Sequence, residues 1–319
     1  MQPPSITVLQ YNVLFANDSA QATPWEDRAA ALRAWIEELD PDVVTLQEVT
    51  LGQRADGTEV DMLADILRGS ALSHHVFGPA CDDVMPSADP GQTDVVIGNA
   101  IASRWPISES EVRALSHFHE AGVFSSKRSA VWARIESPHG PVGVTCTHLN
   151  SIAHHGANRA DQMVEVLDLV KSRQQTKMVN LRLSPVGMPP ILCGDMNAVG
   201  QSDEIRYACG HHAINGRTAP LQLHDAWASA NPAGPEDTGW TMVPSDSMAD
   251  KIGDHRIRYA YPKRIDYVFV GTPGADGAGH VLSCEVVGDD RFGTWPSDHL
   301  AVFARVRAPA PAPDAAAKL

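Results

Sequence analysis

Short apolar runs that each close on a polar side chain recur along this chain and constrain its fold more than any other feature. SITVLQY (5–11) is β-branched and apolar and stops at Asn12, and DVVTLQE (42–48) closes on Glu48. Runs of this length and composition predict buried strands. Strand ends that gather on one edge of a layered sheet form a rigid cleft, where ligands tend to bind. The same pattern places further polar residues at predicted strand ends: His148, Asp195, Asn197 and Asp266.

Helical patterns separate the first predicted strands. After 5–11, apolar residues fall on one helical face until Asp40-Pro41 ends the helix, and a second helical stretch surrounds 62–67. This β-α-β-α alternation indicates a layered α/β domain. Later segments are strand-like, and two of them are joined by a turn-forming tetrapeptide that predicts an antiparallel hairpin. These segments are RSAVWARIE and VGVTCTHL for the hairpin, then PILCGDMN, RIDYVFV, HVLSCEVV and DHLAVFARVR.

The sequence shows no composition break that would divide it into two folding units. We therefore expect one domain over residues 1–307 and a disordered, Ala/Pro-rich tail over 308–319. Residues 200–263 are rich in Gly, Pro, Asp and His and have only short periodic patches, so we expect long surface loops there, near the site.

The charge balance limits the kind of partner. Asp and Glu outnumber Lys and Arg by 39 to 25, which gives a formal net charge of −14. Such a surface repels polyanions on average, and no run of Lys and Arg suggests a local basic patch. A small or bound substrate is therefore preferred to bulk duplex DNA, although distant basic residues can still converge in the fold.

The cysteines and the N-terminal residues indicate the cellular compartment in which the protein is expected. The five cysteines are scattered, odd in number and without CxxC spacing, which argues against a disulfide framework or a zinc knuckle. The N-terminal residues MQPPSITVLQYN lack a basic segment followed by an apolar stretch, and no apolar run is long enough to span a bilayer. We expect a cytoplasmic protein without stable membrane insertion, and no protein partner can be inferred.

The residue types at the predicted strand ends match one kind of chemistry. Hydrolysis of a phosphoester needs a hard cation, a base for water and donors for the developing charge. Four residues offer oxygens of the kind that Mg²⁺ prefers, and three offer donors. The oxygen set is Asn12, Glu48, Asp195 and Asp298, and the donor set is His148, Asn197 and His299.

Each of these residues also has a purely structural interpretation. Asp266 could form an ordinary salt bridge with Arg264, which is the better interpretation when that segment is taken alone. GDMN (194–197) could be a tight turn, since Gly, Asp and Asn are common turn residues. A lone histidine such as His148 is more often a hydrogen-bonded residue of a half-buried strand.

In chain order, the segments LQYNVL, LQEV, CTHLNS, CGDMNAV, RIDYVFV and WPSDHLAVFARV resemble the motif series of the endonuclease/exonuclease/phosphatase superfamily. The resemblance covers about residues 5–307, and six motifs in the right order are far more specific than a lone GDMN. It implies an α/β (α+β) fold: a four-layer αββα sandwich of two packed mixed or antiparallel sheets flanked by helices.

The resemblance also implies a role for each motif residue. Glu48 binds the catalytic Mg²⁺ or Mn²⁺, with Asn12 and Asp298 close to the same ion. Asp195 orients or deprotonates the attacking water. The remaining implied roles are phosphoryl contacts from Asn197 and His299, orientation of His299 by Asp266, a place for His148 beside the phosphate or leaving group, and a phosphate contact from Arg128 at the head of RSAVWARIE.

Other conspicuous residues lie outside the positions that the superfamily uses for metal. Trp240 and Thr241 resemble a Thr/Trp element before the RIDYVFV strand and are expected in the core or in the cleft wall. Surface loops are the expected place for three histidine-rich patches. These patches are His117 with His119, His154-His155 and His211-His212.

Three functions remain open at this level. The first is hydrolysis of a phosphodiester or phosphomonoester in a small molecule, a nucleotide or a lipid headgroup, by in-line attack of metal-assisted water. The second is a DNA or RNA nuclease with the same site, and the third is a binding module that has lost turnover. The nuclease needs phosphate contacts on the cleft rim, for which the candidates are Arg104, Lys127, Arg128, Arg256, Arg258, Lys263 and Arg264.

Overall fold

The computed structural model describes most of the chain. The described residues are 3–16, 21–54, 57, 59–80, 92–121, 127–174, 176–179, 182–185, 187–232 and 238–309. Residues 310–319 lie outside these ranges, so disorder of the Ala/Pro tail stays a prediction.

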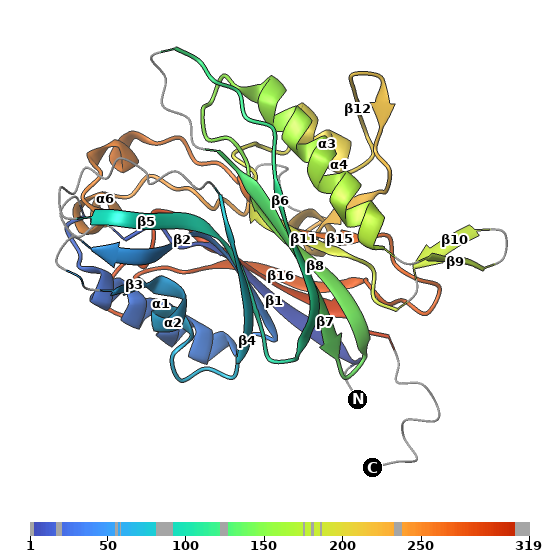
Figure 1. The fold of residues 1–319 in the computed structure, drawn as a ribbon, viewed down its shortest axis with the longest axis horizontal. Helices are drawn as coiled ribbons and strands as arrows, with labels where there is room; N and C mark the ends of the chain where they lie inside the picture. The colour runs from blue at the N-terminus through green and yellow to red at the C-terminus, as the bar shows by residue number, and fades with distance from the viewer. Residues whose placement is uncertain are drawn as a thin grey trace.

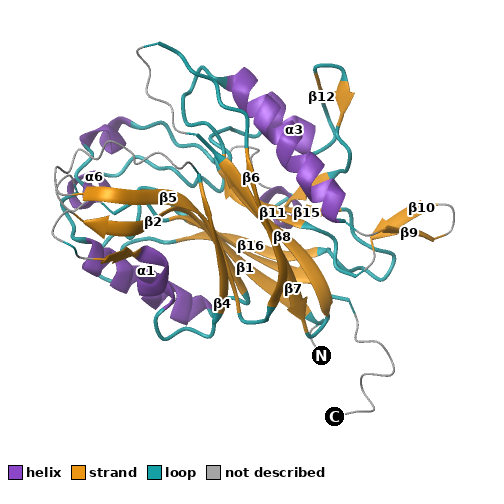
Figure 2. Cartoon of the chain, viewed as in Figure 1, coloured by secondary structure: helices purple, strands orange, loops and turns teal. Residues whose placement is uncertain are grey.

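Two mixed β-sheets form the centre of the fold, as Figures 1 and 2 show. The first sheet has the order β16 (Val281–Val287), β17 (Ala301–Arg307), β1 (Ser5–Asn12), β2 (Val43–Arg54), β5 (Gln92–Ser103) and β4 (His74–Pro79), with β3 (Glu59–Asp61) paired to β2. The second has the order β14 (Leu223–Asp225), β15 (Asp266–Gly271), β11 (Ile191–Asp195), β8 (Gly140–His148), β7 (Ser129–Ser137) and β6 (Ile107–Ala114).

Apolar side chains fill the space between the sheets and the space between each sheet and its helices. Between the sheets, residues such as Val8, Val144 and Val302 form one buried cluster. On the outer face of the first sheet, α1 (Trp25–Leu39) and α2 (Met62–Leu67) pack on a second cluster. On the outer face of the second sheet, α3 (Gly156–Arg173) and α4 (Asp203–Ala208) pack on a third. The order helix, sheet, sheet, helix confirms the four-layer sandwich (Figure 1).

The predicted strands and the first helix are confirmed in place. The apolar face of α1 carries Leu32, Trp35 and Ile36, all buried. β7 and β8 form the predicted antiparallel hairpin, with Ala130 opposite Thr147. Cys146, Cys193, Cys209 and Cys284 are free thiols, and Cys81 lies outside the described residues.

The prediction of long loops over 200–263 is wrong in part. This stretch contains several short elements, because small groups of apolar residues such as Met248, Ile252 and Ile257 form a local cluster of their own. The elements are α4, β12 (Ala213–Ile214), β13 (Arg217–Thr218), β14, α5 (Ala226–Ala230), α6 (Asp246–Ile252) and the 3₁₀ helix η1 (His255–Tyr259). A further small hairpin, β9 (Thr176–Val179) with β10 (Arg182–Pro185), follows α3.

None of the helices within the described ranges combines the length and the apolar character needed to cross a bilayer.

Candidate active site

Strand direction brings the predicted site residues to one edge of the two sheets. Asn12 ends β1, and the antiparallel β17 begins just after His299. In the second sheet, Asp195 ends β11 and lies opposite Asp266, which begins the antiparallel β15. The parallel β8 ends at His148, also in register with Asp195. The start of an antiparallel strand and the end of its neighbour share an edge, so Asp266 belongs to the site although it opens its strand.

Glu48 reaches this edge in a way that the sequence does not indicate. The expected strand end at Glu48 is wrong, because β2 continues to Arg54. Instead, the pairing with β5 shifts register between Leu46 and Val49, and Glu48 has a left-handed φ of 61°. Such a bulge turns one side chain out of the regular alternation. The Glu48 carboxylate then accepts hydrogen bonds from Asn12 Nδ2 at 3.2 Å and from the Phe15 main-chain N–H at 3.3 Å.

Asp195 is the hub of the cluster. Its Oδ2 accepts a hydrogen bond from Asn12 Nδ2 at 3.1 Å, and its Oδ1 accepts one from the Asn197 main-chain N–H at 2.8 Å. The Nε2 atoms of His148 and His299 lie 3.3 Å and 3.8 Å from the same Oδ2. Asp195 is almost fully buried, so this carboxylate meets protein donors rather than bulk water.

His299 bridges the two buried aspartates. Its Nδ1 lies 2.8 Å from Asp266 Oδ2, while its Nε2 faces Asp195. Arg264, the alternative partner of Asp266, instead pairs with Asp225 at 2.5 Å. The interpretation of Asp266 and Arg264 as an ordinary salt bridge is therefore wrong, because the Asp266 carboxylate is hydrogen-bonded to the buried imidazole of His299.

Thr241 holds the start of β15 in place. Its hydroxyl oxygen accepts hydrogen bonds from the main-chain N–H groups of Ile265 and Asp266, each at 3.2 Å. The Thr241 carbonyl accepts a hydrogen bond from the Leu300 N–H at 2.7 Å. Thr241 is fully buried, which agrees with its expected place in the core, and it links the residue after His299 to the start of β15.

The electrostatic environment shifts the pKa values of Asp195, His299 and His148 in different ways. Burial, and next the Asp266 charge, raise the pKa of Asp195 to about 7. Burial works to lower the pKa of His299, but the Asp266 carboxylate beside it raises that pKa well above its ordinary value. Burial, together with the charges of Arg128 and His299, holds the pKa of His148 well below its ordinary value. Near neutral pH the site thus combines a charged His299, a neutral His148 and a carboxyl group that can exchange a proton.

Asn197 and Arg128 lie on the rim of the cluster. Asn197 has a left-handed φ of 48°, a conformation that Asn tolerates better than most residues, and its Nδ2 donates to the Leu149 carbonyl at 3.1 Å. Arg128 is buried, and one of its terminal nitrogens donates to Ser151 Oγ at 3.0 Å. Because its charge lowers the pKa of His148, Arg128 lies within electrostatic reach of that ring.

Asp298 and Glu48 are the carboxylates of the cluster that remain half-exposed. Ser297 Oγ donates to the Asn12 carbonyl at 2.7 Å, which fixes the Ser297-Asp298-His299 segment against the end of β1. Asp298 also contributes to the raised pKa of His299, so its charge is close to that ring. Glu48, Asp298 and the amide oxygen of Asn12 offer oxygen atoms, the donor type that suits Mg²⁺ or Mn²⁺.

The structure thus brings Asn12, Glu48, His148, Asp195, Asp266 and His299 into one connected group. Single atoms of Asp195, Asp266 and His299 lie within 4.8 Å of one another, a spacing that can also hold an ion. Within the described residues, Asp266 Oδ1 is buried and has no hydrogen-bond partner.

Arg28 is a residue of the site region that the sequence interpretation missed. It is fully buried in α1, and its Nε donates to the Pro296 carbonyl at 3.0 Å while a terminal nitrogen donates to the Val13 carbonyl at 2.5 Å. Arg28 therefore ties the segments after Asn12 and before Asp298 together. The available signal was its position on the apolar face of the helix, where an arginine needs polar partners.

A second cluster joins Glu120 to the adjacent histidines. Glu120 Oε2 lies 2.9 Å from His154 Nε2 and 2.8 Å from His155 Nε2. His155 is buried, so the expected surface position is wrong for this residue. Asn150 Oδ1 accepts from the Ile152 N–H, which turns Nδ2 of the same amide toward His155 Nδ1 at 3.3 Å. Since Nδ1 then accepts, Nε2 carries the proton and donates to Glu120, and this arrangement favours a hydrogen bond to the carboxylate over a metal site.

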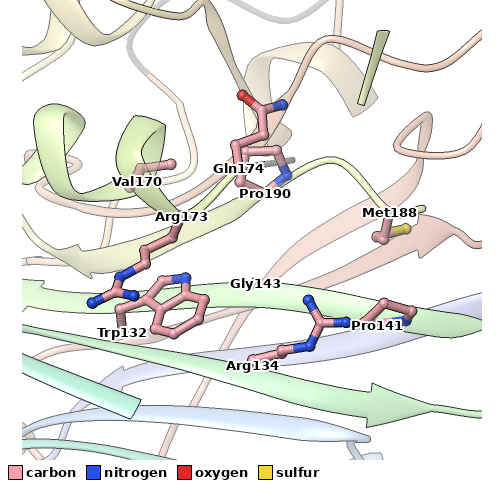
Figure 3. A pocket seen from close by; sticks show the side chains of 9 residues that line it. All are labelled: Trp132, Arg134, Pro141, Gly143, Val170, Arg173, Gln174, Met188 and Pro190. Carbon is pink, nitrogen blue, oxygen red and sulfur yellow. The ribbon is translucent and has the colours of Figure 1, made fainter. Parts of the chain in front are cut away.

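A small cavity of about 40 Å³ lies at the other end of the second sheet, between α3 and β8 (Figure 3). It is lined by Gly143, near the start of β8, and by Pro190, just before β11. His148 and Asp195 end those same strands, so this cavity belongs to the opposite edge and is not part of the site.

The two-sheet sandwich with polar residues along one edge places this chain among the layered α/β proteins. Comparison with known proteins identifies its family. A family model, the Endonuclease/Exonuclease/phosphatase family, matches residues 9–299. The chain belongs to this family, whose members are metal-dependent phosphoester hydrolases or nucleases. A search of curated protein sequences gives no match.

Comparison with solved structures shows the same fold. An endonuclease/exonuclease/phosphatase from Beutenbergia cavernae DSM 12333 is 25% identical, with a TM-score of 0.64 over 97% of this chain and 72% of its own. TDP2 from D. rerio with a single-strand DNA product is 19% identical, with a TM-score of 0.62 over 95% and 98%. The human Nocturnin catalytic domain with bound sulfate is 19% identical, with a TM-score of 0.60 over 96% and 95%.

Proposed function

We propose that this protein is a Mg²⁺- or Mn²⁺-dependent hydrolase that cleaves a phosphodiester or phosphomonoester in a small molecule, a nucleotide or a lipid headgroup. The observation that carries the proposal is the unbroken series of contacts from Glu48 through Asn12, Asp195 and His299 to Asp266. Carboxylate, amide and imidazole groups in such a series supply every function that water attack on phosphorus requires.

Glu48 and Asp298, with the amide oxygen of Asn12, would hold the metal ion. The oxygen of Asn12 accepts one hydrogen bond, from the Leu14 N–H at 3.1 Å, and keeps a second lone pair. Both carboxylates are half-exposed, so an ion can reach them from the cleft. A bound divalent ion neutralises phosphate oxygens and lowers the pKa of attacking water.

The protein's own groups divide the remaining work. Asp195, with a pKa near neutrality, accepts the proton of the attacking water. Asn197 Nδ2 and the charged imidazole of His299 donate to the phosphoryl oxygens, and Asp266 keeps that imidazole protonated and oriented. Neutral His148 lies beside the phosphate or leaving group, and Arg128 binds a phosphate oxygen at the rim.

A substrate panel tests this proposal. Release of alcohol or phosphate is measured with Mg²⁺ and with Mn²⁺ on phosphomonoesters, phosphodiesters, abasic DNA, RNA and choline phospholipids. We expect at least one small phosphoester to be hydrolysed, and Asp195→Asn or His299→Ala to lower kcat by roughly 10³-fold or more.

The matched control is Asp168→Asn, since Asp168 is an exposed carboxylate that pairs with Arg217 on the surface. This variant should retain the parent activity. Hydrolysis of no ester with either ion, or near-parent activity in Asp195→Asn, would show that the assignment is wrong.

A further inference from the structure

A pocket of about 400 Å³ is lined by segments that lie close in the chain to residues of the proposed catalytic cluster. It is lined by residues 199–201, by Trp240 and by residues 262–264. We call it the Trp240 pocket. Its volume lies within the range in which proteins bind small molecules.

The Trp240 pocket continues directly from two segments of the site. Val199 follows Asn197 by two residues, and Arg264 precedes Asp266 by two residues. Consecutive Cα atoms are about 3.8 Å apart, so each wall begins within roughly 8 Å of a residue of the catalytic cluster. A phosphate held at Asn197 would therefore lie next along the chain to a wall of the Trp240 pocket.

Exposed apolar side chains line this pocket, and exposed aromatic residues precede one of its walls in the chain. Trp240 is 41% exposed, and Val199 on the facing wall is 37% exposed. Tyr259 and Tyr261, which lead into the wall residue Pro262, are 82% and 88% exposed. Aromatic faces open to solvent next to a polar site bind flat rings by stacking.

The charges near the pocket favour a small ligand over a long polyanion. Arg264 pairs with Asp225, Arg256 pairs with Asp254, and Arg258 pairs with Asp250. These pairs neutralise most of the positive charge that a nucleic-acid backbone would need. Lys263 is exposed on the pocket wall, where a single cation suits one additional oxygen or phosphate of a small ester.

We propose that the Trp240 pocket binds the planar, base-like ring of a nucleotide-type phosphoester, with Trp240 as the stacking residue. This inference rests on the proposed function and narrows it to a ring-bearing small substrate. The catalytic cluster binds the phosphate, and the Trp240 pocket distinguishes esters that carry a planar ring from esters that do not.

Pairs of esters that are identical at phosphorus test the inference. One pair is adenosine 5′-phosphate and ribose 5-phosphate, and the other is the methyl diester of each. For whichever pair is hydrolysed, we expect the base-bearing member to have a kcat/KM roughly tenfold higher, as expected for one stacked base. Trp240→Phe should retain most of this preference, and Trp240→Leu should reduce the ratio toward one.

Leu282→Ala is the control, because Leu282 is an exposed apolar residue of β16 outside the pocket. It should keep the parent preference. Because Trp240 is half-exposed and only its side chain changes, the main-chain bonds between Thr241 and Lys263 are retained, and circular dichroism verifies the fold of each variant.

Equilibrium dialysis of adenosine 5′-phosphate and ribose 5-phosphate against the same variants separates failure of the inference from failure of the proposed function. Absence of turnover on every ester contradicts the proposed function, and the dialysis still decides on the pocket. A parent protein without preference for the base, or equal preference in Trp240→Leu and the parent, overturns the inference.

Discussion

Asp266 and Arg264 are two residues apart, yet they take different partners. Asp266 meets His299 in the buried cluster, whereas Arg264 pairs with Asp225 and lies over the ring of Tyr267, 4.7 Å from its centroid. A buried carboxylate needs a charged or hydrogen-bonding partner at short range, and the fold supplies one from a segment distant in the chain. Nearness in sequence therefore does not predict the partner of a buried charge.

Asp266→Asn tests how this pair sets the protonation of His299. The change removes the largest contribution that raises the pKa of His299, while burial, which lowers it, remains. We expect the pKa of His299 to fall, as measured by NMR titration of its imidazole. Asp168→Asn, an exposed substitution, should leave that titration unchanged, and an unaltered titration in Asp266→Asn would contradict the interpretation.

The same variant has a defined effect on stability as a function of pH. Because the folded pKa of His299 is raised, its contribution is fully present below the unfolded value of about 6.5 and is lost as the pH rises through the folded value. The parent should therefore exceed Asp266→Asn in free energy of unfolding most near pH 6, and the difference should shrink at alkaline pH. Urea denaturation of the metal-free proteins measures this trend.

At the scale of the elements, the close pairing of β8 and β11 sets the position of Asp195. The two strands are parallel, and Gly194 faces Thr147 across the pair. A Cβ atom on Gly194 would lie 2.1 Å from the Thr147 main-chain oxygen, so only glycine fits before the hub residue. The GDMN segment thus has a packing requirement as well as the turn character that its composition suggests.

Gly194→Ala should therefore push β11 away from β8. We expect a loss of about 2 kcal/mol or more in the free energy of unfolding, as is typical of overpacking, and a fall in activity because Asp195 shifts. Gly156→Ala is the matched control, since its Cβ would meet only Arg159 at 3.6 Å. The urea denaturation midpoints of the parent and of both variants measure the effect. Equal midpoints for the parent and Gly194→Ala would show that β8 and β11 accommodate the added methyl group without loss of stability.

For the whole molecule, the four layers bring the proposed metal-binding oxygens and proton-transfer groups together from segments that meet only in the folded protein. Glu48 comes from the first sheet and Asp195 from the second, with Asn12 between them. An ion bound at this edge binds the folded state and not the unfolded one, so it should stabilise the whole protein.

Thermal unfolding with and without metal measures this coupling. At a Mg²⁺ or Mn²⁺ concentration roughly 100 times its Kd, we expect Tm to rise by at least about 3 °C, and a chelator should reverse both the rise and the activity. Glu48→Gln should reduce the rise, whereas Glu37→Gln, on the exposed face of α1, should keep it. An equal rise in the parent and Glu48→Gln would place the ion elsewhere.

Much of the fold and the membership of the site followed from local sequence. Apolar runs such as 5–11 identified the strands, because a buried strand needs continuous apolar side chains, and helical spacing identified α1. The polar residues that close these runs identified the candidate site, since a buried strand ends in such residues only where they find partners. The order of the motifs indicated the family that the family model shows.

Tertiary structure alone decided how these residues meet. The bulge that turns Glu48, the burial that raises the pKa of Asp195, and the contacts of Arg28 all depend on segments far apart in the chain. Pairing and burial are properties of the packed sheets, which no local pattern contains. For the same reason, the sequence predicted loops near the site over residues 200–263, but only packing formed part of them into the Trp240 pocket.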